Sequence, residues 1–155
     1  MQALLPKAAS GVMKRLEDGP WASWSTWTND PFSIEAGPYY ARWDEAGEPV
    51  CAFRAEAKHM NSSGGLHGGC MMAFADFAIF ILSWKALGED SAVTASFSGD
   101  FLGSVTPGAL VECRGEIVKA GRSMIFVRGL VTSETGPIMS FQSVLKKTRM
   151  PGAVA

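Results

Sequence analysis

A run of mostly apolar residues over positions 67–87 separates two differently patterned parts of the chain. Its centre holds one acid, Asp76, and Gly88 follows its end. A helix that is apolar on all sides in a globular chain is wrapped by other elements. The uninterrupted apolar parts are too short for a membrane span, and a central acid opposes one. The run therefore predicts one long buried helix over 67–87.

Alternating patterns typical of strands lie on both sides of this helix. Residues 39–43 and 50–57 read as a hairpin before the helix. In the first run after it, alternation places Val93 and Phe97 on one face and Thr94 on the other. Short turns favour antiparallel pairing, so we expect an α+β fold with a curved antiparallel sheet around the helix. The four strand-like runs after the helix span 92–102, 109–120, 123–133 and 137–147.

The N-terminal part carries a different pattern. Apolar residues at helical spacing over 8–18 predict a helix, which Gly19-Pro20 ends. Three tryptophans follow at three-residue spacing, at Trp21, Trp24 and Trp27. They either pack against the domain or form a flap over a ligand pocket. We expect an N-terminal helical extension over 1–34 and one domain over 35–155.

Composition narrows the possible functions. The 155 residues carry a net charge of -1 and no long Lys or Arg run, so we expect no nucleic-acid or membrane partner. Three separated cysteines, with no CxxC pair, favour reduced thiols and a cytoplasmic location. With only His59 and His67 as histidines, we expect no zinc or other metal site and no redox cofactor.

The segment "HMNSSGGLHGGCMMAFAD", residues 59–76, resembles a family signature. It is similar to the H-x-N-x-x-G-x-x-H-G-G-x6-D motif of hotdog-fold phenylacetyl-CoA and human-type acyl-CoA thioesterases, within the 4-hydroxybenzoyl-CoA thioesterase superfamily. The resemblance covers roughly residues 35 to 147. It implies the hotdog fold, hydrolysis of an acyl-CoA thioester, and dimers that pair into tetramers.

The glycines of this motif stand where the buried helix begins. A helix N-terminus leaves backbone N–H groups unpaired, with partial positive charge. Gly68 and Gly69 carry no side chain that would block a substrate, so the Gly68 amide is a suitable oxyanion donor. The resemblance implies the same role for Gly68 and assigns carbonyl polarisation to Asn61. The alternative is that the glycines form a turn and Asn61 caps the helix.

Asp76 is the candidate acid. Burial of an unpaired carboxylate costs several kcal/mol, so its place in an apolar helix favours a function. The structural alternative is a cap or an ion pair across a subunit contact. The resemblance implies that Asp76 activates water or attacks the thioester to form a mixed anhydride, and that Thr94 helps to orient it. Thr94 could equally make an ordinary cross-strand contact, and His67 could brace the loop.

Helix geometry indicates that two chains build the site. Gly68 and Asp76 are eight residues apart, about 12 Å at 1.5 Å per residue, so they cannot touch one thioester. Two antiparallel copies of the helix would bring them together. Met72 and Phe80 share a face with Asp76 and are candidates for the acyl pocket. Arg122, at a turn tip, is a candidate contact for the CoA phosphates.

We therefore expect an acyl-CoA thioesterase, a homodimer or dimer of dimers, that needs no cofactor beyond the CoA of its substrate. Two alternatives stay open. One is a hotdog-fold enoyl-thioester hydratase or dehydratase, and the other is a module that binds acyl-CoA without hydrolysing it.

Overall fold

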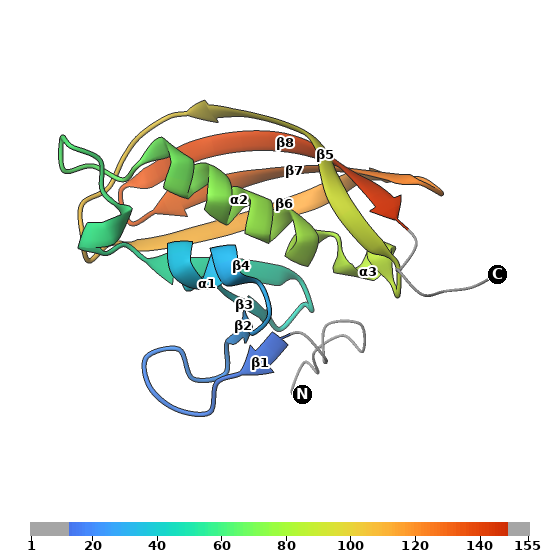
Figure 1. Cartoon of the computed structure of the whole chain (residues 1–155), viewed down its shortest axis with the longest axis horizontal. Helices are drawn as coiled ribbons and strands as arrows, with labels where there is room; N and C mark the ends of the chain where they lie inside the picture. The colour runs from blue at the N-terminus through green and yellow to red at the C-terminus, as the bar shows by residue number, and fades with distance from the viewer. Residues whose placement is uncertain (1–12, 149–155) are drawn as a thin grey trace.

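A computed structural model describes residues 13–148, and its central feature is one helix held in a curved sheet (Figure 1). The helix, α2 (Gly68–Leu82), contacts strands on both flanks of the sheet. The eight strands are antiparallel to their neighbours, in the order β1-β2-β3-β4-β6-β7-β8-β5. They are β1 (Met13–Arg15), β2 (Ser25–Trp27), β3 (Tyr40–Trp43), β4 (Pro49–Arg54), β5 (Ser91–Phe101), β6 (Leu110–Ala120), β7 (Met124–Ser133) and β8 (Gly136–Thr148).

The helix is ordered by burial rather than by amphipathicity. Phe74, Ala75, Ala78 and Ile79 are completely buried against the sheet. The predicted helix over 67–87 is confirmed, with one break at Ser83, after which α3 (Trp84–Leu87) begins. Gly88 caps α3 with a positive φ of 59°. The predicted hairpin and the four later strands are confirmed as β3–β4 and β5–β8.

The prediction of a helix over 8–18 is wrong where the structure describes it. Met13–Arg15 forms β1 and pairs with β2, with Met13 opposite Trp27; residues 8–12 lie outside the described range. Met13 is buried, so its apolar side chain belongs to the hydrophobic core rather than to a helix. The tryptophans do not share one helical turn, because Trp21 lies in a turn and Trp27 lies in β2. Trp21 stacks on Tyr40, with ring centroids 4.1 Å apart.

Two further features differ from the predicted pattern. A six-residue helix, α1 (Pro31–Ala36), follows β2 and lies beside α2. In β5 the register against β8 shifts between Thr94 and Ser96. This bulge reverses the face on which residues before it project, so Thr94 and Phe97 share the inner face. The simple alternation that separated them is wrong.

Candidate active site

The loop before α2 holds Asn61 in a fixed orientation. Its Oδ1 accepts hydrogen bonds from the Ser63 N–H at 2.9 Å and the Gly65 N–H at 3.2 Å. The side chain is otherwise exposed. With the oxygen engaged by the loop, the Nδ2 group is the part of the side chain left to donate to a ligand. Asn61 therefore sits in its own loop and does not cap α2.

The cap of α2 is His67. Its Nδ1 accepts from the Gly69 N–H at 2.8 Å, and its carbonyl accepts from the N–H groups of Cys70 and Met71. His67 is thus a bracing residue, and the Gly69 amide is occupied. Within residues 13–148 the Gly68 N–H has no acceptor. The first turn of α2 therefore leaves one amide, that of Gly68, available to a carbonyl oxygen.

Asp76 lies two turns along α2 and is half-buried in the single chain. Thr94 Oγ1 donates to Asp76 Oδ1 at 2.6 Å. The bulge in β5 makes this contact possible, because it turns Thr94 toward the helix. Since the hydroxyl occupies only one oxygen, Oδ2 stays available to accept a proton or to attack a carbonyl. The structure thus pairs two of the predicted site residues.

A cavity of about 410 Å³ opens beside this carboxylate. Phe80, which was predicted as an acyl-pocket residue, contributes to its wall. Met72 does not line this cavity and is 44% exposed on the same stripe of α2. Trp27, considered above as part of a flap, also lines the cavity. Five further lining residues were not predicted as site residues, because no motif marks them. They are Asn29, Asp30, Pro31, Ser33 and Phe77.

The candidate residues form two separate groups within one chain. Asn61, His67, Gly68 and Gly69 lie at the N-terminus of α2. Asp76 and Phe80 lie in its second half, with Asp76 about 12 Å from Gly68 along the helix axis, and Thr94 reaches Asp76 from β5. Arg122 follows Gly121, in the exposed turn between β6 and β7. That turn lies at the end of the sheet away from the N-terminus of α2 (Figure 1).

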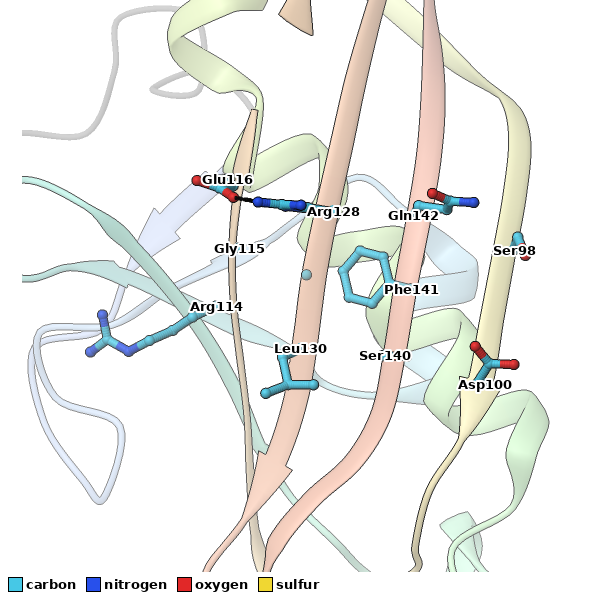
Figure 2. Close-up of a pocket in the computed structure, with 11 residues that line it drawn as sticks. Ser98, Asp100, Arg114, Gly115, Glu116, Arg128, Leu130, Ser140, Phe141 and Gln142 are labelled. Atoms are coloured by element: carbon cyan, nitrogen blue, oxygen red, sulfur yellow. Dashed lines mark hydrogen bonds and ion pairs between the residues drawn. The ribbon is translucent and has the colours of Figure 1, made fainter. Parts of the chain in front are cut away.

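A larger cavity of about 670 Å³ lies on the opposite, outer face of the sheet. Figure 2 shows that its charged groups come from neighbouring strands, with Glu116 directed toward Arg128. Arg128 Nε donates to Glu116 at 2.7 Å, and Arg114 donates to Asp44 at 2.9 Å. These exposed arginines are already neutralised, and the cavity contains no predicted site residue. Although this cavity is the larger of the two, its residues do not point to a catalytic centre.

Cys70 stands next to the candidate site but is unsuited to act as a nucleophile. Burial raises the pKa of its thiol, and the Tyr39 hydrogen bond and the Lys58 charge oppose this rise without cancelling it. Its sulfur lies 3.9 Å from the Tyr39 hydroxyl. Because only the thiolate is nucleophilic, Cys70 does not compete with Asp76. His59 is buried and holds its loop, accepting from the Glu56 N–H at 2.9 Å.

Comparison with known proteins identifies a family. Residues 63–140 match the family model of the thioesterase superfamily. The matched span begins in the loop before α2 and includes Asp76 and Thr94. A comparison with curated protein sequences found no match.

The same fold is found in several solved structures. The TT0310 protein from Thermus thermophilus is 29% identical, with a TM-score of 0.65 over 79% of this chain and 100% of that chain. A variant of the phenylacetic acid degradation protein PaaI from the same organism is also 29% identical, with a TM-score of 0.65 over 78% and 100%. A hypothetical thioesterase from Streptococcus pneumoniae, solved with coenzyme A, is 20% identical, with a TM-score of 0.64 over 77% and 93%. The predicted hotdog fold is confirmed.

Proposed function

This chain belongs to the thioesterase superfamily, and from that premise we propose that it hydrolyses an acyl-CoA at an active site shared by two subunits. The chain is a thioester hydrolase that resembles the PaaI thioesterases. CoA as the thiol carrier is our inference, supported by the motif around α2 and by the neighbour solved with coenzyme A.

The observation that carries the proposal is the short hydrogen bond between Thr94 and Asp76 beside a cavity. The Thr94 hydroxyl orients one oxygen of the carboxylate, and the other oxygen stays available for the reaction. It either removes a proton from the attacking water or attacks the thioester carbon itself. Both routes need the carboxylate at this position.

The second half of the chemistry is stabilisation of the oxyanion. In the general-base route, water adds to the thioester carbon while Asp76 takes its proton, and the carbonyl oxygen becomes an oxyanion. The Gly68 N–H and Asn61 Nδ2 donate to that oxygen. Collapse of the intermediate then breaks the carbon–sulfur bond, and the proton passes from Asp76 to the CoA sulfur.

The distance along α2 supports a site whose oxyanion donors and acid come from different chains. Gly68 and Asp76 are eight residues apart on one continuous helix, about 12 Å along its axis. Antiparallel packing of two α2 helices across a two-fold axis would place Asp76 of one chain near Gly68 of the other. Each dimer would then contain two equivalent sites.

The edge of the sheet supports such a dimer. Within the described part of the chain, β5 is the last strand of the sheet and pairs on one side only, with β8. It leaves Val93 and Phe101 more than half exposed, at 51% and 53%. A long edge strand with exposed apolar residues invites pairing with another strand. A second copy of β5 would cover this edge and bring the two α2 helices together.

The experiment is thiol release from a panel of acyl-CoAs by the wild type, Asp76→Asn and Asp100→Asn. Asp76→Asn keeps an acceptor for Thr94 but loses the base, so we expect kcat to fall about 10²–10⁴-fold. Asp100 is an acid on the outer face, and its variant should keep wild-type activity. A wild type that hydrolyses no member of the panel, or full activity in Asp76→Asn, would contradict the proposal.

A further inference from the structure

The cavity beside Asp76 has walls from two distant parts of the chain. One wall is α2, with Asp76, Phe77 and Phe80. The other runs from the end of β2 to the start of α1 and contributes Trp27, Asn29, Asp30, Pro31 and Ser33. This second wall precedes the segment that matches the family model, residues 63–140. It is therefore a feature of this chain that the family match does not describe.

The second wall is held in place by its own contacts. Asp30 Oδ1 accepts from the Ser33 N–H at 3.2 Å, and Oδ2 accepts from Ser33 Oγ at 2.9 Å. The Trp27 ring meets the Phe77 ring edge-on, with centroids 6.2 Å apart. Lys58 Nζ donates to the Glu35 carbonyl at 3.1 Å. These contacts fix the wall against α2, so the cavity has a defined shape.

The lining has a distinct chemical character. Trp27, Phe77 and Phe80 supply aromatic surface, which suits an apolar acyl or aryl group. Two of the lining side chains, Asp30 and Asp76, are carboxylates, and none of the lining residues described is Lys, Arg or His. A negatively charged group entering the cavity would meet two like charges and no counter-charge.

We propose that this cavity receives the acyl group, and that Asp30 makes the enzyme select uncharged acyl groups over acyl groups with a terminal carboxylate. The inference rests on the proposed thioesterase function and adds its substrate class. Asp76 is required for the reaction, so its charge is common to all substrates. Asp30 takes no part in the reaction and is the residue through which selection can be changed.

The physical basis is repulsion between like charges in a partly enclosed space. Such repulsion is stronger near a protein surface than in bulk water and weakens with salt over a Debye length of about 8–10 Å. A terminal carboxylate also loses hydration on entering an aromatic cavity without gaining a cationic partner. Both effects act on the charged acyl group and leave a neutral one of equal length unaffected.

The test compares pentanoyl-CoA with glutaryl-CoA, which differ by a terminal carboxylate on a chain of equal length. The variant Asp30→Asn removes the charge and keeps a residue that caps helices well. We expect the ratio of kcat/KM for pentanoyl-CoA over glutaryl-CoA to fall about 5–10-fold in this variant, mainly through glutaryl-CoA. Added salt should bring the kcat/KM ratios of the wild type and the variant closer together.

The matched control is Glu35→Gln, which removes an exposed carboxylate from the same short helix but outside the cavity. It should leave the ratio unchanged. A second variant, Trp27→Leu, opens the aromatic wall and should shift preference toward bulkier neutral acyl groups. Thermal melting of each variant checks that the fold is intact.

The two possible failures are distinguishable. If the wild type hydrolyses pentanoyl-CoA but Asp30→Asn gives the same ratio as Glu35→Gln, the selection by Asp30 is wrong and the thioesterase function stands. If Trp27→Leu also leaves the acyl preference unchanged, the cavity is not the acyl site. If the wild type hydrolyses neither these nor any other acyl-CoA, the proposed function fails and this inference falls with it.

Discussion

The two faces of α2 differ sharply although they belong to one apolar helix. One face carries Phe74, Ala75 and Ala78, which are completely buried against the sheet. The other carries Met72, which is 44% exposed, and the half-buried Asp76. The first face has no group capable of acid–base chemistry. The second has the catalytic candidate and the cavity.

This difference shows how stability and chemistry are divided along the helix. The packed face supplies the buried surface that holds the sheet and helix together. Less of the open face is buried by packing within the chain, so this face is free to contact substrate and a second subunit. Substitutions on the two faces should therefore separate into effects on unfolding and effects on turnover.

The largest expected effect is on the packed face. Phe74 contacts the rings of Tyr39, Phe53 and Phe77. Phe74→Ala should lower the free energy of unfolding by about 3–5 kcal/mol, through lost burial and a residual cavity. Met72→Ala, on the open face, should cost less than about 1 kcal/mol in the isolated chain. Urea unfolding measures both, and equal losses would remove the distinction between the faces.

The next effect concerns thiols beneath the packed face. Burial raises the pKa of Cys51 and of Cys113, which lie opposite each other on β4 and β6. Their thiols stay protonated in the folded state while the unfolded chain loses protons above about pH 8.5. Stability is therefore fully present below that pH and falls as pH rises. At about pH 9.5 the burial of each thiol should lower the free energy of unfolding by about 1 kcal/mol relative to neutral pH.

The measurement is the melting temperature between about pH 7.5 and pH 9.5, for the wild type and for the double variant Cys51→Ala with Cys113→Ala. The double variant should have a lower melting temperature at both pH values but a smaller fall between them. A fall as steep as that of the wild type would show that these thiols are not the cause.

The smallest effect is on the open face. Thr94→Val keeps the shape of the side chain and removes the donor to Asp76. We expect kcat to fall about tenfold, in line with the loss of one hydrogen bond to a charged group. Thr94→Ser, which restores a hydroxyl, should recover most of the activity. If Ser and Val behave alike, Thr94 has no part in positioning Asp76.

Much of the fold follows from residue patterns, and the exceptions have physical reasons. The apolar run around Asp76 and the alternating segments after it predict α2 and β5–β8. The bulge at Thr94 was not predictable, because one extra residue in a strand reverses the facing of its neighbours without changing composition. A start signal for α1 was present in Asp30 followed by Pro31, a cap and a preferred first helical residue.

The candidate site divides in the same way. The motif over 59–76 marked Asn61, Gly68 and Asp76, because their types and spacing carry chemistry. The wall formed by Trp27 and Asp30 carries no motif. It joins the site only because β2 pairs with β3 and brings the start of α1 against α2. Contacts between segments so distant in sequence arise from the tertiary fold, which local patterns do not encode.

The most direct test of the shared site is complementation between two inactive variants. Asn61→Ala removes an oxyanion donor and Asp76→Asn removes the acid, so each homodimer should be nearly inactive. When the two chains are co-expressed with different tags, each purified mixed dimer contains one site with both native residues. We predict about half of wild-type activity. Mixed dimers no more active than either parent would contradict an active site built from two chains.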